Sequence, residues 1–152
     1  MDFRTLLLNE FVFLDGGMGT MLHLSPGELP ERLNLTEPAR VAAVHKAYAE
    51  AGSQIVYTNT FGANPLKLAG TGVDPAESIR AAVRIAKEAV GEGVCVALDI
   101  GPTGQLLPPA GQMTFEAAYE SFRVMCEAGA EAGADLIVIE TMSDLLETKA
   151  AL

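Results

Sequence analysis

The sequence predicts an α/β protein of the (β/α)8, or TIM-barrel, type, of which these 152 residues supply about the first four β/α units. Four short apolar runs alternate with four stretches of helical periodicity, and the polar residues that end the runs stand at positions 15, 58, 99 and 140. These positions are 41 to 43 residues apart, and such regular spacing is typical of repeated supersecondary units. Since a complete barrel needs eight strands, we expect residues 1–152 to form a single, incomplete domain, the amino-terminal half of a barrel.

The predicted strands are residues 11–14, 54–57, 94–98 and 136–139. They are rich in aliphatic and aromatic side chains and lack clean alternation, as expected for parallel strands covered on both faces. A polar group follows each strand, where barrel enzymes keep their chemistry. Together with the near-uniform length of the units, this favours a barrel over an open, doubly wound sheet.

Helix start and stop signals separate the strands. The first helix begins at Thr36, Glu37 and Pro38 and ends at Gly52, and the second begins at Asp74, Pro75 and Glu77 and ends at Gly91. Thr114 precedes the third helix, and Ser143 and Asp144 begin the fourth. The predicted buried stripes are Val41, Val44, Tyr48 and Ala51, then Ile79, Val83, Ala86 and Val90, then Phe115, Tyr119, Phe122 and Met125. Four strands alone would leave sheet edges with unpaired backbone N–H and C=O groups. We therefore expect association with a carboxyl-terminal half-barrel or self-association.

Composition excludes several classes of partner. Twenty acidic and ten basic side chains give a net charge of -10, which repels nucleic acid and anionic membrane surfaces. No run reaches the roughly 18 apolar residues of a membrane span, and the first residues lack a signal-peptide cleavage site. Cys95 and Cys126 lie in a strand-like and a helix-like run, which favours reduced, buried thiols. A cytoplasmic protein without nucleic-acid or membrane partners fits these features.

The segment Leu14-Asp15-Gly16-Gly17-Met18-Gly19-Thr20 directly follows the first predicted strand. Its glycines allow a tight turn and the close approach of a ligand to backbone N–H groups. A structural turn is one alternative, and a phosphate site at residues 16–19 is another. A dinucleotide fingerprint is disfavoured, because the third glycine of G-x-G-x-x-G is missing.

Asp15 and Glu140 follow apolar strands, where a carboxylate is costly unless a cation or donors meet it. One interpretation is that both hold a ligand ammonium group; the alternative is that they cap helices or pair with surface cations. Thr58 and Asn59 begin a polar loop. Either this loop binds a ligand carboxylate, or its polar groups hydrogen-bond one another within a turn. Asp99 either shapes the same opening or caps a turn.

His23 and His45 lack the spacing and companions of a metal site, so a packing or surface role is the simpler interpretation of His45. The two cysteines are likewise not spaced to hold zinc. We expect no metal ligand in this chain.

Five segments together resemble the homocysteine S-methyltransferase family. They are LDGGMGT at 14–20, NLTEP at 34–38, TNTFGAN at 58–64, DIGPTG at 99–104 and ADLIVIET at 134–141. The resemblance runs through nearly the whole chain in order. It is greatest to the amino-terminal, homocysteine-binding barrel of the cobalamin-dependent members that make methionine.

The resemblance implies a zinc-dependent methyl transfer to the homocysteine thiolate, with methylcobalamin as one methyl donor. Asp15 and Glu140 match family positions that contact the substrate amino group. Gly16 and Gly17 match the backbone beside it. Thr58 and Asn59 match the loop that faces its polar end, and all six are therefore predicted substrate-binding residues.

The family's zinc is held by cysteines of the second half-barrel, which neither Cys95 nor Cys126 matches. The resemblance therefore implies that this chain contains no catalytic residue, lacks zinc and is inactive alone. The alternative is a non-catalytic, self-associating half-barrel or subunit.

Overall fold

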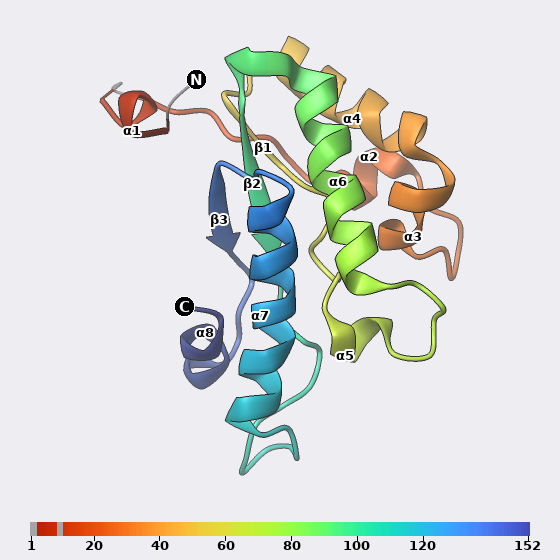
Figure 1. The fold of residues 1–152 in the computed structure, drawn as a ribbon, viewed down its shortest axis with the longest axis vertical. Helices are drawn as coiled ribbons and strands as arrows, with labels where there is room; N and C mark the ends of the chain where they lie inside the picture. Colours follow the sequence, from red (N-terminus) through yellow and green to blue (C-terminus); the bar gives the residue numbers. More distant parts are fainter. Residues whose placement is uncertain (1–2, 9–10) are drawn as a thin grey trace.

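The computed structural model describes residues 3–8 and 11–152. Its centre is a parallel sheet of β1 (Ile55–Tyr57), β2 (Cys95–Ile100) and β3 (Leu136–Ile139), in that order (Figure 1). These strands confirm the predictions at 54–57, 94–98 and 136–139 to within two residues. Because β2 runs to Ile100, Asp99 lies inside the strand and not in the loop after it.

The strand predicted at 11–14 is wrong as a regular element. The segment makes one isolated parallel bridge, between Leu14 and Ile55. The carbonyl oxygen of Phe13 accepts hydrogen bonds from the N–H groups of Gln54 at 2.8 Å and Ile55 at 3.3 Å. In the described part of the chain, no strand pairs with its other side, and the side chains of Phe11 and Phe13 are 70% and 64% exposed. The segment therefore follows β1 with an incomplete ladder.

The four predicted helices are present as α4 (Pro38–Glu50), α6 (Pro75–Val90), α7 (Phe115–Glu131) and α8 (Leu145–Ala151). Three begin with side-chain caps, which satisfy backbone N–H groups of the first turn. Asp74 accepts from Glu77 N at 2.7 Å, Thr114 from Ala117 N at 3.1 Å, and Asp144 from Leu146 N at 2.7 Å. Pro38 occupies the first position of α4 instead, where a missing N–H costs nothing.

Short helical segments were not predicted. They are α1 (Phe3–Leu6), α2 (Met18–Leu22), α3 (Pro30–Thr36), α5 (Pro65–Leu68) and the 3₁₀ turn η1 (Gly91–Gly93). One or two turns contain too few residues to show a helical period. They also depend on their surroundings, since so short a helix is unstable alone.

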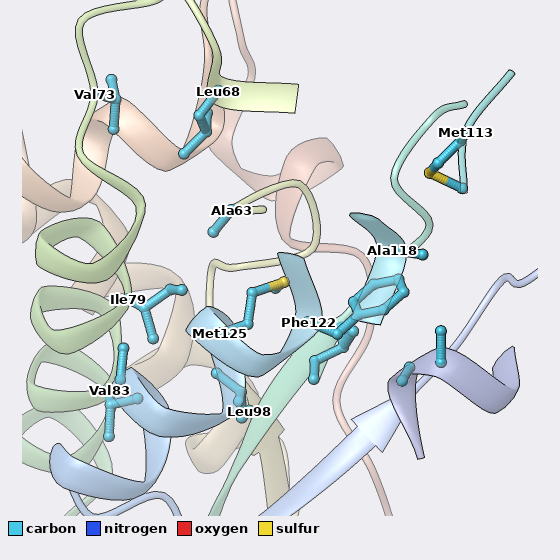
Figure 2. Packing of buried hydrophobic residues seen from close by; sticks show 14 of the residues in the cluster. Ala63, Leu68, Val73, Ile79, Val83, Leu98, Met113, Ala118, Phe122 and Met125 are labelled. Carbon is cyan, nitrogen blue, oxygen red and sulfur yellow. The ribbon is translucent and has the colours of Figure 1, made fainter. Parts of the chain in front are cut away.

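The largest hydrophobic core lies between the sheet and α6 and α7 (Figure 2). Leu98 from β2 packs there with Ile79 and Val83 from α6 and with Phe122 and Met125 from α7. In Figure 1 these helices run side by side along the same face of the strands. These two helices cover one face of the sheet, which is called the outer face below.

Two stripe predictions are wrong. Tyr119 is 49% exposed, because the buried face of α7 passes through Ala118, Phe122 and Gly129 instead. Ala51 is exposed as well, since it lies beyond the end of α4. Small residues allow α7 to approach the sheet closely, and a pattern search for large apolar side chains overlooks them.

The opposite, inner face of the sheet has a separate cluster. Leu6 of α1 covers Ile55, Cys95 and Ala97 there. Side chains alternate along a strand, so the next inward position on β2 is Asp99. Polar groups therefore begin where the inner apolar cluster ends, at the carboxyl ends of the strands.

Within the described residues, no helix combines the length and the apolar character needed to cross a membrane.

Candidate functional site

A cavity of about 470 Å³ opens at the carboxyl ends of the strands. The structure brings all six predicted substrate-binding residues to it. Its lining is Asp15, Gly16, Gly17, Met18, Gly19, Pro30, Glu31, Tyr57, Thr58, Asn59, Phe61, Asp99, Glu140 and Thr141. These residues come from segments far apart in the sequence, which the parallel topology collects at one end of the sheet.

Asp15 is held firmly at the edge of this cavity. Its backbone N–H donates to Ile55 O at 3.0 Å, and its Oδ2 accepts from the backbone N–H of Tyr57, also at 3.0 Å. Its Oδ1 is buried and has no partner in the described part of the chain. Burial, and to a smaller extent the nearby Glu140, raises the pKa of Asp15 to about 6, although the bond from Tyr57 opposes this shift. The geometry thus presents one free carboxylate oxygen.

The two glycines after Asp15 lie against Tyr48 of α4. A Cβ at Gly16 would stand 2.9 Å from the Tyr48 hydroxyl oxygen, which leaves no room for a larger residue without displacing that ring. The same hydroxyl donates to the carbonyl oxygen of Gly17 at 3.4 Å. Gly16 therefore permits a close approach, and Tyr48 supports the turn that leads into α2.

The hydroxyl group of Thr58 forms hydrogen bonds within the protein. Its Oγ1 lies 2.7 Å from Thr60 Oγ1 and accepts from the backbone N–H of Asp99 at 3.1 Å. The Thr60 hydroxyl in turn donates to Asp99 O at 2.7 Å. The hydroxyl proton of Thr58 is therefore directed to Thr60, and the side chain fixes the loop after β1 to the end of β2.

Asn59 has a comparable structural role. Its Nδ2 donates to Pro30 O at 2.8 Å and to Asn34 Oδ1 at 2.9 Å, while Asn34 Nδ2 returns a bond to Asn59 O at 2.9 Å. Asn34 also donates to Ser78 Oγ, which donates to Glu31 O. These bonds attach α3 to the cavity wall. Ligand contacts by Thr58 and Asn59 stay a prediction, since their side-chain donors are already used.

Sequence reasoning missed Glu31. It follows Pro30 in the first turn of α3 and is buried, and its Oε1 accepts from the backbone N–H of Gly62 at 2.8 Å. Proline followed by an acidic residue is a helix-start signal that could have identified α3. No pattern in the sequence indicates that Glu31 reaches the same cavity as residues from four other segments.

Glu140 continues the backbone pairing of β3, because its N–H donates to Ile100 O at 3.0 Å. The next residue, Thr141, has a φ of 56°, a left-handed conformation that is unfavourable for a β-branched residue. The chain turns sharply there, and both residues line the cavity. Strained backbone of this kind is often found at functional sites.

The electrostatics of the cavity are strongly one-sided. Four carboxyl groups line it, from Asp15, Glu31, Asp99 and Glu140, and no lysine, arginine or histidine is among the lining residues. Burial is the main cause that raises the pKa of Asp99 to about 8, followed by the charges of Glu140, Asp15 and Glu31. Burial and the charges of Glu140, Asp99 and Asp15 also raise the pKa of Tyr57. The site is suited to a cation and opposes the phosphate-binding alternative.

The described residues do not fit the zinc site that the resemblance implies. No three of their His, Cys, Asp and Glu side chains are grouped to hold a metal ion. Cys95 belongs to the inner cluster of the sheet, whereas Cys126, on α7, packs against the outer core. His45 is fully buried on α4, where desolvation lowers its pKa to about 4, so it is a packing residue and not a surface one.

Fold and site together define a parallel β/α protein with an acidic cavity at the carboxyl ends of its strands. The family model for homocysteine S-methyltransferases matches residues 12–152. The chain belongs to the homocysteine S-methyltransferase family.

Two methionine synthases are similar to this chain, one from Mycobacterium leprae (strain TN) and one from Mycobacterium tuberculosis (strain ATCC 25618 / H37Rv). Each is 32% identical over 169 aligned residues, which cover 99% of this chain and 14% of the synthase. The chain therefore spans about one seventh of these relatives.

The homocysteine methyltransferase MmuM from Escherichia coli has a similar fold. Its metallated form superposes with a TM-score of 0.83 and 26% identity, over 97% of this chain and 59% of that enzyme. The apo form gives 0.75 and 28%, over 97% and 56%. The fold is thus that of a homocysteine methyltransferase in part, with an open sheet instead of a closed barrel.

Proposed function

We propose that this chain is the homocysteine-binding part of a homocysteine S-methyltransferase, in which Asp15 and Glu140 hold the substrate ammonium group. The observation that carries the proposal is the cavity with four carboxyl groups and no basic side chain in its lining. A buried carboxylate is costly without a cation, and a ligand ammonium supplies one. Family membership identifies homocysteine as the amino thiol to test first.

The free Oδ1 of Asp15 is the first acceptor for this ammonium. Because Oδ2 is fixed by the Tyr57 N–H, the free oxygen has a defined direction before the ligand arrives. Such preorganisation reduces the entropy that binding costs. Gly16 and Gly17 give the ligand access to the backbone beside this group. The contribution of this half is therefore to hold and orient the substrate.

We further propose that the chain is inactive in methyl transfer by itself. The family implies zinc as the group that binds the substrate sulfur and methylcobalamin as one methyl donor, but the described residues offer no zinc ligand set. The chain spans 59% of the metallated E. coli enzyme, so a carboxyl-terminal half-barrel is the expected partner. Two cysteine thiols that form no disulfide among the described residues suit a reducing compartment such as the cytoplasm.

The alternative function is a non-catalytic half-barrel that associates with a second copy of itself. The observation that favours it is the exposed apolar edge at Phe11 and Phe13. Homocysteine binding separates the two functions, since a purely structural subunit has no need of an ammonium site.

Isothermal calorimetry with homocysteine tests the proposal directly. Asp15→Asn and Glu140→Gln each remove one charged contact, so each is expected to weaken binding about 10- to 100-fold. Glu50→Gln is the matched control, because Glu50 is exposed at the end of α4 and does not line the cavity. The ligand control is 4-sulfanylbutanoate, which lacks the amino group. Equal binding of homocysteine and this analogue would contradict the ammonium site.

A further inference from the structure

Asp99 is the carboxyl group of the cavity that the ammonium site leaves unexplained. It is 7% exposed, and its Oδ1 is buried without a partner in the described part of the chain. Its backbone N–H and C=O are bonded to Thr58 and Thr60, so the residue is fixed on the inner face of β2. Because β2 is the central strand, Asp99 lies at the middle of the row of strand ends.

The number of acceptors matches the number of donors on the ligand. A primary ammonium group has three N–H donors. Asp15 and Asp99 each keep one buried oxygen without a partner, and Glu140 lines the same cavity. If each carboxylate accepts one N–H, Asp15 and Glu140 satisfy two of the three donors, and leaving the third N–H of a desolvated ammonium without an acceptor is expensive. A third acceptor on the central strand completes the set.

We propose that Asp99 is the third acceptor for the ligand ammonium, beside Asp15 and Glu140, and that the empty cavity holds a proton that it releases to solvent when the ligand binds. This inference rests on the proposed function. It adds two properties that the family assignment does not contain: a specific third contact and a linkage between substrate affinity and pH.

The groups that face Asp99 are all acidic or neutral at neutral pH. They are Asp15 before α2, Glu31 on α3, Tyr57 on β1 and Glu140 after β3. The basic side chain of Lys67 on α5 lies over the Phe61 ring, with its Nζ 5.0 Å from the ring centre, and does not line the cavity. Several carboxylates that share a desolvated site cannot all ionise together.

The direction of the proton linkage follows from this crowding. In the empty cavity the pKa of Asp99 is raised to about 8, so at pH 7 the group is mostly a neutral acid. A bound ammonium favours the carboxylate form and lowers this pKa. The released proton passes to solvent, and no other group is transferred. Affinity therefore rises with pH until Asp99 is already ionised in the empty protein.

Calorimetric titration of the 152-residue chain with homocysteine at pH 7, in two buffers of different ionisation heat, counts the released protons. The wild-type chain is expected to release close to one more proton per ligand than Asp99→Asn. Its affinity should rise nearly tenfold from pH 6 to pH 7, whereas most of that rise is lost in the variant. Comparison at equal pH cancels the ionisation of homocysteine itself, and Glu50→Gln again serves as control.

Each outcome is decisive. Binding of homocysteine with equal proton release by the wild type and Asp99→Asn overturns the inference and leaves the proposed function intact. An absence of homocysteine binding overturns both. A carboxyl ¹³C NMR titration of the ligand-free chain gives an independent result, because an Asp99 that titrates in the ordinary range also overturns the inference. Asp99→Ser repeats the comparison should the asparagine variant fail to fold.

Discussion

Asp99 is buried and Asp15 is half-buried, and no basic side chain is among the described residues that line their cavity. Ionisation of the two carboxyl groups therefore opposes folding of the empty protein. Their pKa values are raised from 3.8 to about 6 and about 8. Since the folded state then binds more protons than the unfolded chain, stability is greatest below about pH 4 as far as these two groups are concerned. It is lost as pH rises through 6 and then 8.

The first prediction concerns this pH dependence. Asp99→Asn should flatten the fall in denaturation midpoint between pH 6 and pH 8.5 and should raise stability at pH 8.5. Urea denaturation at a series of pH values measures both effects. Glu50→Gln should keep the wild-type slope. An unchanged slope in Asp99→Asn would mean that Asp99 already ionises normally in the folded protein.

Thr141 gives a second prediction at the scale of single residues. Its φ of 56° is unfavourable for threonine, whereas glycine adopts it freely. Thr141→Gly should therefore stabilise the protein by about 1 kcal/mol, measured by urea denaturation. Gly133→Ala is the converse control, because Gly133 has a φ of +86° and open space around a Cβ. It should cost about as much, and a destabilised Thr141→Gly would show that the Thr141 side chain matters more than the strain.

The place of a residue in the structure could be predicted from the sequence where the residue directly follows a predicted strand; the ligand contacts of these residues stay a prediction. Asp15 and Glu140 each follow an apolar run, and parallel strands bring such ends together at one cavity. The sequence does not decide whether Asp99 shapes the cavity opening or caps a turn, because the depth of Asp99 in β2 depends on where the strand ends. Glu31 reaches the cavity from α3, which Asn34, Asn59 and Ser78 attach to the cavity wall, and no local pattern encodes these long-range bonds.

At the scale of elements, the long helices and covered strands were predictable because period and caps are local signals. The segment 11–14 has the composition of a strand, but its pairing with β1 is limited to one bridge, between Leu14 and Ile55, and composition alone does not show how far a pairing extends. The contacts between loops could not be predicted from local sequence patterns either. Gly101, just after β2, packs on Phe61 in the loop after β1, and its N–H donates to Phe61 O at 3.1 Å.

The third prediction follows from that contact. A Cβ at Gly101 would lie 2.7 Å from Phe61 O and 2.5 Å from its ring. Since a backbone atom cannot move aside cheaply, Gly101→Ala should destabilise the protein by about 1 to 3 kcal/mol. It should also weaken homocysteine binding, because Phe61 lines the cavity. Gly93→Ala is the control, as nothing lies within 4 Å of its added Cβ. Equal stability of the two variants, measured by thermal unfolding, would refute the packing argument.

At the scale of the whole molecule, the fold is an arc of β/α units with an open sheet and exposed apolar side chains. Helices cover the outer face of the sheet, while Leu6 is the buried α1 residue of the inner cluster. Unpaired strand edges and exposed apolar side chains promote association. The similar E. coli enzyme is longer than this chain. The family could be predicted because five ordered motifs lie within the sequence, whereas the proposed half-barrel partner has no comparable local signal.

The last prediction tests which surface drives association. Phe11 and Phe13 are exposed beside the isolated bridge at Leu14, where a neighbouring strand and its helix would pack in a closed barrel. The chain alone should therefore sediment as concentration-dependent oligomers, and Phe11→Ser with Phe13→Ser should shift it toward the monomer. Stability should change little, since exposed side chains contribute little to the core. Tyr119→Ser, at an exposed position on α7 away from this edge, should leave association unchanged. A wild-type chain that remains a monomer at all concentrations would contradict the argument, because the edge would then need no cover.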